Sequence, residues 1–406
     1  MKSWVEISGP RLAANYNVLA AAAGDDTAVL AVVKANAYGH GAAVCAPVLA
    51  RAGAKWLGVA DAAEGYAVRE ALAAAGIEAP QQPEILVMCG GLSEDADFIV
   101  QQKLTAVVWE REQLEWLVAA AMRAGSTAPL PIHLEIDTGM ARQGIAPGEA
   151  LHTLLHWLKQ QKALRLDGVM THFASAEVAG SLQTLKQRAL FEQAVEAVAA
   201  AGLQPLWVHA GTSSTIDNQG TDENLSWLRG LAKSLNARSM VRTGVALYGY
   251  CLPVLASAPA AAPAAHPRAH VQPHLQPVMS WKTRVIGLRD LQPGDTVGYN
   301  ATFSAQRAMR LALLPVGYSD GLRRELSGSD TQAGGWAMVH GQQAPIIGRV
   351  SMNLTVVDIS KISGIAIGDE VVLLGDGITA DDHARLAHTI AYEIVCGVRA
   401  RSHVAL

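Results

Sequence analysis

The sequence predicts an α/β protein in which an N-terminal (β/α)8 barrel of the TIM type is followed by a mostly antiparallel β domain. Eight short apolar segments alternate with helix-like segments across residues 9–255. An Ala/Pro-rich stretch then occupies residues 256–275, and short β-branched runs separated by Gly, Pro and Asp follow in residues 276–406. Alternating strands and helices form a parallel sheet, and eight such units close into a barrel.

The order of the elements follows from the spacing of apolar residues. Met1–Ile7 alternates like an edge strand, and Pro10–Ala23 has helical spacing with a proline suited to a first turn. The predicted barrel strands are apolar runs of the kind found in buried parallel sheets: Val29–Val33, Trp56–Ala60, Glu84–Cys89, Thr105–Trp109, Ile132–Ile136, Leu166–Thr171, Leu206–His209 and Ser239–Val241. The predicted helices between them include Ala42–Ala52, Ala62–Ala75, Arg111–Ala124, Glu149–Gln161 and Ser181–Ala201.

The length of 406 residues favours two domains. We expect a barrel over 9–255, a linker or insertion over 256–275, and a β domain over 276–406 that includes the N-terminal strand 1–8. A helix over Ala380–Tyr392 and a short strand should end the chain. The predicted strands of the β domain are Val285–Leu288, Arg310–Val316, Ala337–His340, Ala344–Val350, Leu354–Ile359 and Glu370–Leu374.

Composition excludes several classes of protein. The net charge of −4 gives no reason to expect nucleic acid or an anionic membrane as a partner. No basic segment precedes an apolar run at the start, and no stretch approaches the roughly 20 apolar residues of a spanning helix. The four cysteines are far apart in the sequence, which predicts neither disulfides nor a zinc site and favours a cytoplasmic protein.

Lys34 ends the apolar run Val29–Val33. A lysine at the end of a buried strand is costly unless it is solvated, paired or covalently used. Desolvation lowers the pKa of a lysine and makes its amine nucleophilic, as Schiff-base chemistry requires. A solvated lysine is the alternative. Gly39 and Gly41 suit a turn that leads into the next helix.

Ionisable residues gather where the predicted strands end. The active sites of such barrels lie at the C-terminal ends of the strands. The sequence places there Lys34, Asp61, Glu135, Asp137, His172, His209 and Arg242. So many ionisable groups at one rim indicate an active site. No metal is expected: His152 and His156 are spaced i, i+4, but Thr153 stands where the zinc-protease motif has glutamate.

The segment from Lys34 to Gly41 resembles the cofactor-lysine motif of the alanine racemases, which are fold-type III pyridoxal-phosphate enzymes. Their order of a barrel followed by a β domain is also found here, and the resemblance extends over nearly the whole chain. Further matching blocks occur in the same order: Asp137–Met140 with Arg142 and Gly144, Thr171–Ala174, Val241–Gly244 with Leu247–Gly249, Val297–Tyr299, Gly317–Gly321, and Ile347–Val350 with Met352.

The resemblance implies a pyridoxal-phosphate-dependent isomerase that interconverts L- and D-alanine and supplies D-alanine for peptidoglycan. Lys34 would form an internal aldimine with the cofactor and move a proton on one face of the substrate. Tyr299 would act on the opposite face in the active site of the other subunit. The implied assembly is therefore a homodimer with shared active sites, in which the β domain supplies the second catalytic residue to the partner.

The resemblance also assigns contacts. Arg242 would bond the pyridine nitrogen with support from His172. The cofactor's phosphate would meet Ser213, the backbone at Gly244 and Val245, and the hydroxyls of Tyr38 and Tyr392. The amino-acid substrate would meet Arg142 and the main-chain amide of Met352, and Tyr318 would narrow the entrance from the partner subunit.

Three positions depart from the family pattern. Glu135 stands where the family usually has a lysine that is carbamylated beside the arginine corresponding to Arg142. Glutamate could supply that negative charge directly as the charge partner of Arg142, so we expect no carbamylation. Asn353 and Thr212 replace a usual aspartate and asparagine. These departures bear on substrate range and rate more than on the reaction type.

Four alternatives remain open at this point. The chain could be a broader-specificity racemase, or one preferring serine or a basic amino acid, on the same fold. A decarboxylase of this fold type would have glutamate in place of Arg242. A pyridoxal-phosphate carrier would not need a second domain bearing Tyr299 and Tyr318, and a purely structural protein would not need Lys34.

Overall fold

The computed structural model describes residues 2–220, 223–256, 269–400 and 402–406. Contacts divide the chain into two compact units. One comprises Leu12–Ala37 and Cys45–Leu275, and the other comprises Met1–Arg11, Tyr38–Val44 and Gln276–Leu406. Most of the predicted insertion at 256–275 lies outside the described residues.

The first unit is a closed barrel of parallel strands, as expected. Around the barrel the strands follow the order β10-β2-β3-β4-β5-β6-β7-β9. Their bounds are β2 Thr27–Val32, β3 Trp56–Val59, β4 Glu84–Val87, β5 Thr105–Val108, β6 Leu130–Glu135, β7 Leu164–Met170, β9 Trp207–His209 and β10 Arg238–Thr243. Nearly every residue of these strands is buried, because helices cover the outside and side chains fill the inside.

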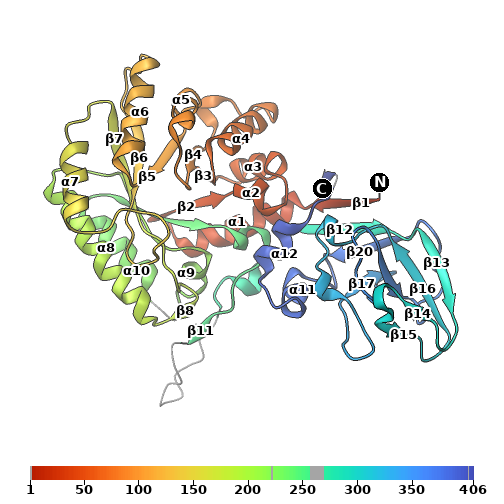
Figure 1. The fold of residues 1–406 in the computed structure, drawn as a ribbon. Coiled ribbons are helices and arrows are strands. Elements are labelled where there is room, and N and C mark those ends of the chain that lie inside the picture. Colours follow the sequence, from red (N-terminus) through yellow and green to blue (C-terminus); the bar gives the residue numbers. More distant parts are fainter. Residues whose placement is uncertain (1, 221–222, 257–268, 401) are drawn as a thin grey trace. The chain divides into compact units, whose positions relative to one another are not determined.

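Helices follow the strands and lie around the barrel (Figure 1). The longer ones are α1 Gly9–Ala23, α3 Ala42–Arg51, α4 Ala62–Ala74, α5 Ser93–Gln101, α6 Arg111–Arg123, α7 Glu149–Leu158, α8 Leu182–Ala200 and α10 Asn224–Ser234. The predicted helices agree with these to within a few residues. Two short strands, β8 Val178–Ala179 and β11 Leu255–Ala256, pair beside the barrel.

The second unit is mostly antiparallel, as expected. Its largest sheet has the order β18-β17-β20-β12-β1-β21, and smaller sheets are β13-β16-β19 and β14-β15. The bounds are β1 Ser3–Ile7, β12 Met279–Arg284, β13 Gly287–Leu291, β14 Thr296–Val297, β15 Phe303–Ser304, β16 Met309–Leu314, β17 Trp336–Val339, β18 Gln342–Pro345, β19 Thr355–Asp358, β20 Glu370–Leu374 and β21 His403–Ala405.

The prediction of an N-terminal edge strand was wrong. β1 pairs antiparallel with β12 on one side and parallel with β21 on the other. The final strand therefore covers the edge that alternation in Met1–Ile7 had suggested. A pairing between the two ends of the chain leaves no local signal in either segment.

The predicted helix over Ala380–Tyr392 was also wrong, because two helices occupy the region: α11 Ala380–Leu386 and α12 Ala391–Gly397. His388 has a φ of 51°, a left-handed value that ends the first helix. Two other β-domain predictions were partly wrong. Val285–Leu288 straddles the break between β12 and β13, and of Ala344–Val350 only the first two residues belong to a strand.

Within the described ranges, no helix has the length and apolar character needed to cross a membrane.

Candidate active site

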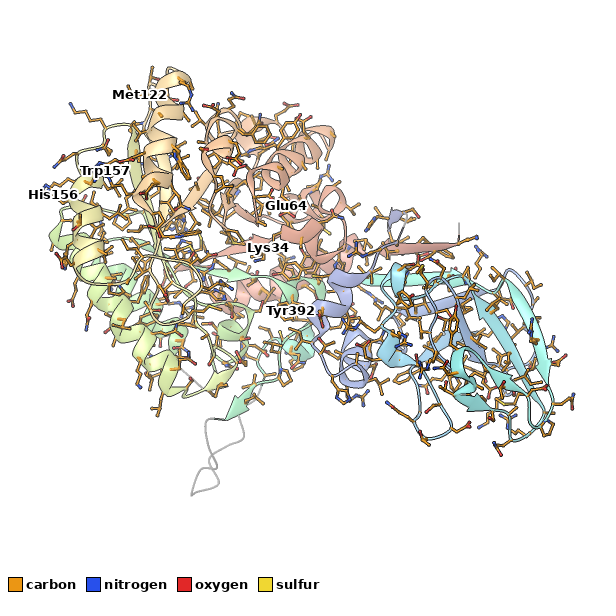
Figure 2. The ribbon with its side chains drawn as sticks, in the orientation of Figure 1. Lys34, Glu64, Met122, His156, Trp157 and Tyr392 are labelled. Atoms are coloured by element: carbon orange, nitrogen blue, oxygen red, sulfur yellow. The ribbon has the colours of Figure 1, made fainter. Side chains whose placement is uncertain are left out.

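Lys34 lies two residues beyond the buried end of β2 and is itself half-buried. Figure 2 shows it at the end of this strand, far from Met122 on α6 and His156 on α7. The short segment α2, Lys34–Tyr38, is left-handed: Ala35, Asn36, Ala37 and Tyr38 have φ values of 52°, 52°, 55° and 52°. Left-handed backbone costs a non-glycine residue roughly 1–2 kcal/mol. The fold therefore strains the chain immediately after the lysine.

Glu64 holds this turn in place. One of its carboxylate oxygens accepts a hydrogen bond from the Asn36 N–H at 3.2 Å, and the other accepts from the Ala60 N–H at 2.9 Å. Asp61, one of the predicted rim residues, caps helix α4 by accepting from the Glu64 N–H at 2.8 Å. In the structure Asp61 therefore has a structural role, because it caps the start of helix α4.

Arg242 lies near the end of β10 and is 5% exposed. Its NH1 group donates to His209 Nδ1 at 3.2 Å. Its NH2 group donates to the Thr171 carbonyl at 2.7 Å and to His172 Nδ1 at 3.1 Å. Within the described part of the chain no acceptor meets Nε, so the Nε–H, together with the second NH1 proton, remains for a ligand.

Of the hydrogen-bonded pair Arg242 and His172, Arg242 carries the positive charge. Burial, followed by the positive charge of Arg242, lowers the pKa of His172 to about 3. Burial lowers the pKa of Arg242 to about 10, with Glu135 acting in the opposite direction. At neutral pH the arginine is therefore a cation and His172 is neutral.

Glu135 ends β6 and is 2% exposed. Gln143 Nε2 donates to its carboxylate and to the Met88 carbonyl, the latter at 2.9 Å. Burial raises the pKa of Glu135, while the Gln143 hydrogen bond and the charges of Arg242 and Arg142 lower it. Arg142 is exposed on the loop that follows β6.

Asp137 shapes that loop. One of its carboxylate oxygens accepts from the N–H groups of Gly139, Met140 and Ala141 at 2.9–3.1 Å. Gly144 closes the loop with a φ of 110°, and a Cβ there would lie 2.5 Å from the Asp137 nitrogen. Asp137 thus sets the path of the backbone that bears Arg142.

Ser213, Gly244 and Val245 lie together in the barrel unit. Ser213 begins α9, Ser213–Asp217, and its Oγ accepts from the Gly244 N–H at 3.2 Å. Val245 begins the 3-10 turn η2, Val245–Tyr248. Among the residues that the structure describes, none accepts the Ser213 hydroxyl proton, so it remains available to an anion. Tyr38 and Tyr392 belong to the other unit, where their ring centroids are 6.0 Å apart.

Tyr299 and Tyr318, which the resemblance assigns to the partner's active site, lie in the β domain, as does Met352. Tyr318 and Met352 are neighbours, because the Tyr318 N–H donates to the Ser351 carbonyl and the Ser319 N–H to the Met352 carbonyl, both at 3.0 Å. Gly317 permits this approach, since a Cβ there would lie 2.1 Å from the Ser351 oxygen. Tyr318 is 44% exposed, Met352 56% and Tyr299 68%.

Asn353 and Thr212, which depart from the family pattern, have local roles. Asn353 donates through Nδ2 to Ser319 Oγ at 2.6 Å, and that hydroxyl donates to the Met352 carbonyl at 2.9 Å. Asn353 thus supports the loop that presents Met352. Thr212 precedes α9, and its N–H donates to Thr215 Oγ1 at 3.1 Å.

Sequence reasoning missed Gln143 and His133. Gln143 lies between Arg142 and Gly144, which were both singled out. His133 lies two residues before Glu135 in β6, so the alternation of side chains along a strand could have placed both on the barrel interior. His152 and His156 are exposed on α7, and no cluster of metal ligands occurs among the residues that the structure describes.

Two models of known protein families match this chain. A model of the N-terminal domain of alanine racemase matches residues 7–252, and a model of its C-terminal domain matches residues 278–406. The chain belongs to the alanine racemase family. The resemblance expected from the sequence blocks is thereby confirmed.

Relatives and solved structures extend over the same length. An alanine racemase of Syntrophobacter fumaroxidans is 34% identical over 400 residues, covering 98% of this chain and 95% of the relative. The structure of alanine racemase from Streptomyces lavendulae superposes with a TM-score of 0.83 at 30% identity, covering 100% and 97% of the two chains. An alanine racemase of Bartonella henselae with covalently bound pyridoxal phosphate gives a TM-score of 0.79 at 25% identity and covers 100% of both chains.

Proposed function

We propose that this chain is an alanine racemase that interconverts L-alanine and D-alanine with pyridoxal phosphate. The observation that supports this most directly is the barrel rim, where one lysine amine and one arginine fork with an unused N–H lie at the ends of neighbouring strands. Membership of the alanine racemase family gives this arrangement its chemistry.

The residues of the rim fit the cofactor. Lys34 supplies the amine that would hold it covalently, and Arg242 Nε–H would meet the pyridine nitrogen. The Ser213 hydroxyl and the backbone at Gly244 and Val245 would hold the phosphate, with Tyr38 and Tyr392 adding hydroxyls. When bound, pyridoxal phosphate withdraws electrons from the substrate Cα and so acidifies its proton.

Two groups move that proton. The Lys34 amine would take it from, or return it to, one face of Cα, and the phenol of Tyr299 from the other subunit would serve the opposite face. Because the two groups act on opposite faces, removal by one and return by the other inverts the configuration. A phenol has a pKa near 10, so nearby positive charge must favour its ionised form for it to act as a base.

Arg242 restricts the outcome of the reaction. An arginine keeps its proton at working pH, so it donates a hydrogen bond to the ring nitrogen without protonating it. Electron withdrawal from Cα is then limited, which favours return of the proton over transamination. His172, neutral and bonded to Arg242, would hold the fork in place.

The substrate would be oriented by its carboxylate. Arg142 and the main-chain amide of Met352 are the groups we assign to it, with Glu135 as the charge partner of Arg142. Tyr318 from the partner subunit would narrow the entrance. A broader-specificity or serine racemase would use the same groups with a wider pocket.

We further propose a homodimer with shared active sites. Tyr299, Tyr318, Met352 and Leu354 of the β domain are large and exposed in the single chain, which a partner surface would explain. The wide spacing of the four cysteines in the sequence and the absence of a membrane-crossing helix among the described residues agree with a cytoplasmic enzyme that supplies D-alanine for peptidoglycan.

Mixed dimers test the whole proposal. Lys34→Ala and Tyr299→Phe chains should each be nearly inactive in both dimer sites. After mixing and subunit exchange, half of the dimers carry one intact site, so about a quarter of wild-type activity should return. The reaction should be followed with a panel of amino acids: conversion confined to alanine supports the proposal, and preference for serine would replace it with the alternative. No recovery of activity in an exchanged mixture would exclude shared sites.

A further inference from the structure

Two histidines form a buried chain with Arg242 inside the barrel. His133 lies in the middle of β6 and His209 ends β9, and both are 0% exposed. His133 Nδ1 lies 2.9 Å from His209 Nε2, and the two rings are 4.8 Å apart in an edge-on arrangement. His209 Nδ1 receives the hydrogen bond from Arg242 NH1.

Arg242 sets the direction of every bond in this chain. A guanidinium can only donate, so His209 Nδ1 must accept and carries no proton. A neutral His209 then has its proton on Nε2 and donates it to His133 Nδ1. His133 in turn carries its proton on Nε2. One tautomer of each ring therefore satisfies both hydrogen bonds, while the His133 Nε2–H is buried without a partner among the described residues.

Both rings are neutral. Burial, followed by the positive charge of Arg242, lowers the pKa of His133 to about 3. Burial, His133 and Arg242 lower the pKa of His209 well below its ordinary value. Arg242 is thus the only cation of the three hydrogen-bonded residues. Both imidazoles are neutral, and each accepts a hydrogen bond at Nδ1.

The backbone provides a dedicated space for His133. The register between β6 and β7 shifts at this residue: Ile132 pairs with Leu166, but His133 pairs with Gly168. A Cβ on Gly168 would lie 2.6 Å from two atoms of the His133 ring. A strand irregularity and a glycine together leave room for an imidazole, and the Trp56 ring packs 5.4 Å away on another side.

We propose that His133 is a positioning residue that sets the orientation of Arg242 through His209. An apolar side chain could fill the same space, but it would leave the His209 Nε2–H without its acceptor in a buried place. His209 would then be released to rotate or change tautomer, and Arg242 would lose a fixed partner on NH1. The catalytic consequence of this inference rests on the proposed function, whereas the hydrogen-bond chain itself does not.

Two substitutions separate hydrogen bonding from packing. His133→Asn keeps an acceptor, because the asparagine side-chain oxygen takes a place close to that of Nδ1. His133→Leu removes the acceptor at similar volume. Gly168→Ala leaves all three members of the chain present but pushes on the His133 ring. His383 in α11 is the matched control, being a histidine with 1% exposure in the β domain; we would test His383→Leu.

The first measurement is nitrogen NMR of the holoenzyme labelled with ¹⁵N-histidine. We expect His209 to carry its proton on Nε2 in the wild type and in His133→Asn, and to change in His133→Leu. With ¹⁵N-labelled pyridoxal phosphate, the pyridine nitrogen resonance should move in His133→Leu and Gly168→Ala and stay in His383→Leu. A wild-type His209 protonated on Nδ1 would overturn the inference.

The second measurement is steady-state kinetics. We expect His133→Leu to lower kcat about 10- to 100-fold, as small misplacements of active groups do, with KM changing less than about 3-fold. His133→Asn should recover most of the loss. Equal kcat values for His133→Leu and the wild type would exclude the positioning role. If His133→Leu fails to fold, the tautomer of His209 in the wild type and the pyridine nitrogen resonance of Gly168→Ala still test the inference.

The two proposals fail separately. A wild-type protein that racemises no amino acid contradicts the proposed function but leaves the predicted tautomers of His209 and His133 to be measured. Conversely, an active racemase in which His133→Leu and His133→Asn behave alike retains the function and loses the role of His133.

Discussion

The Nε2 of Gln143 donates a hydrogen bond to the carboxylate of Glu135, and its other proton binds the Met88 carbonyl at 2.9 Å. The loop after β6 is thereby tied to the end of β4, and the carboxylate is fixed in a place where it is 2% exposed. Burial raises the pKa of Glu135, and the Gln143 hydrogen bond and the charges of Arg242 and Arg142 act in the opposite direction. In the proposed site, the Glu135 carboxylate would supply a negative charge that does not depend on carbon dioxide.

Glu135→Gln removes the charge while preserving size. Buried charged hydrogen bonds contribute roughly 1.5–3 kcal/mol, so we expect kcat/KM to fall at least about 10-fold. The wild-type rate should be insensitive to added bicarbonate at fixed pH and ionic strength. Glu94→Gln, an exposed change in α5, is the control. A bicarbonate-dependent wild-type rate, or full activity of Glu135→Gln, would contradict the role given to Glu135.

Lys34→Ala tests the covalent amine. We expect the visible absorbance of bound pyridoxal phosphate and racemisation to be lost together, since one group provides both. Lys55→Ala removes an exposed lysine of the same unit and should change neither. Absorbance spectra measure the bound cofactor, and turnover in both directions measures racemisation. Sustained turnover without Lys34 would exclude the proposed chemistry.

Tyr299→Phe tests the second acid/base group. General acid–base catalysis contributes roughly 10²–10⁴-fold, and the phenol serves only one face of Cα. We expect proton abstraction from one enantiomer to slow far more than abstraction from the other. Deuterium exchange at Cα, measured from each enantiomer, reports this directly. Tyr66→Phe in α4 is the control, and small equal losses in both directions would remove Tyr299 from its role.

The barrel was predictable because its strands are buried on both faces. Runs such as Val29–Val33 are apolar throughout, and their ends mark the rim, so Lys34, Glu135 and Arg242 could be located from sequence. Long-range pairing was not predictable: β21 covers β1 although nothing near residue 5 indicates it. The role of His133 was not predictable for a similar reason. It depends on a hydrogen bond to His209 and on the pairing of His133 with Gly168 after a shift in strand register.

Acid should destabilise the protein through its buried histidines. An unfolded histidine titrates near pH 6.5, whereas burial and the charge of Arg242 lower the pKa of folded His133 to about 3. Between these values the unfolded chain binds a proton that the folded chain does not. The free energy of unfolding therefore falls as the pH falls, by about 2 kcal/mol from pH 7 to pH 5 for this residue.

Urea unfolding of the wild type and His133→Asn at both pH values measures that contribution. The variant should lose about 2 kcal/mol less on acidification than the wild type, whatever its stability at pH 7. His156→Asn, a change on the exposed face of α7, is the control and should follow the wild type. Parallel losses in His133→Asn and the wild type would show that His133 is not kept neutral.

The left-handed turn after Lys34 predicts a reversal in the effect of glycine. Ala35 is exposed and has a φ of 52° and a ψ of 48°, so its side chain contributes strain and little packing. Ala73 is exposed within the right-handed helix α4. Glycine adopts the left-handed region readily, whereas in a helix it is less favourable than alanine by roughly 0.8–1.0 kcal/mol.

Ala73→Gly should therefore lower the free energy of unfolding by about 1 kcal/mol, while Ala35→Gly should leave it unchanged or raise it by up to about 1 kcal/mol. Ala35→Val should be the most harmful of the set, because a β-branched side chain is strongly disfavoured at positive φ. Urea unfolding of the four proteins gives the order. Because the turn positions Lys34 through the Asn36–Glu64 bond, Ala35→Val should also weaken the cofactor absorbance. If Ala35→Gly and Ala73→Gly cost the same, the left-handed conformation is not present in solution, and the strain placed beside the lysine is absent with it.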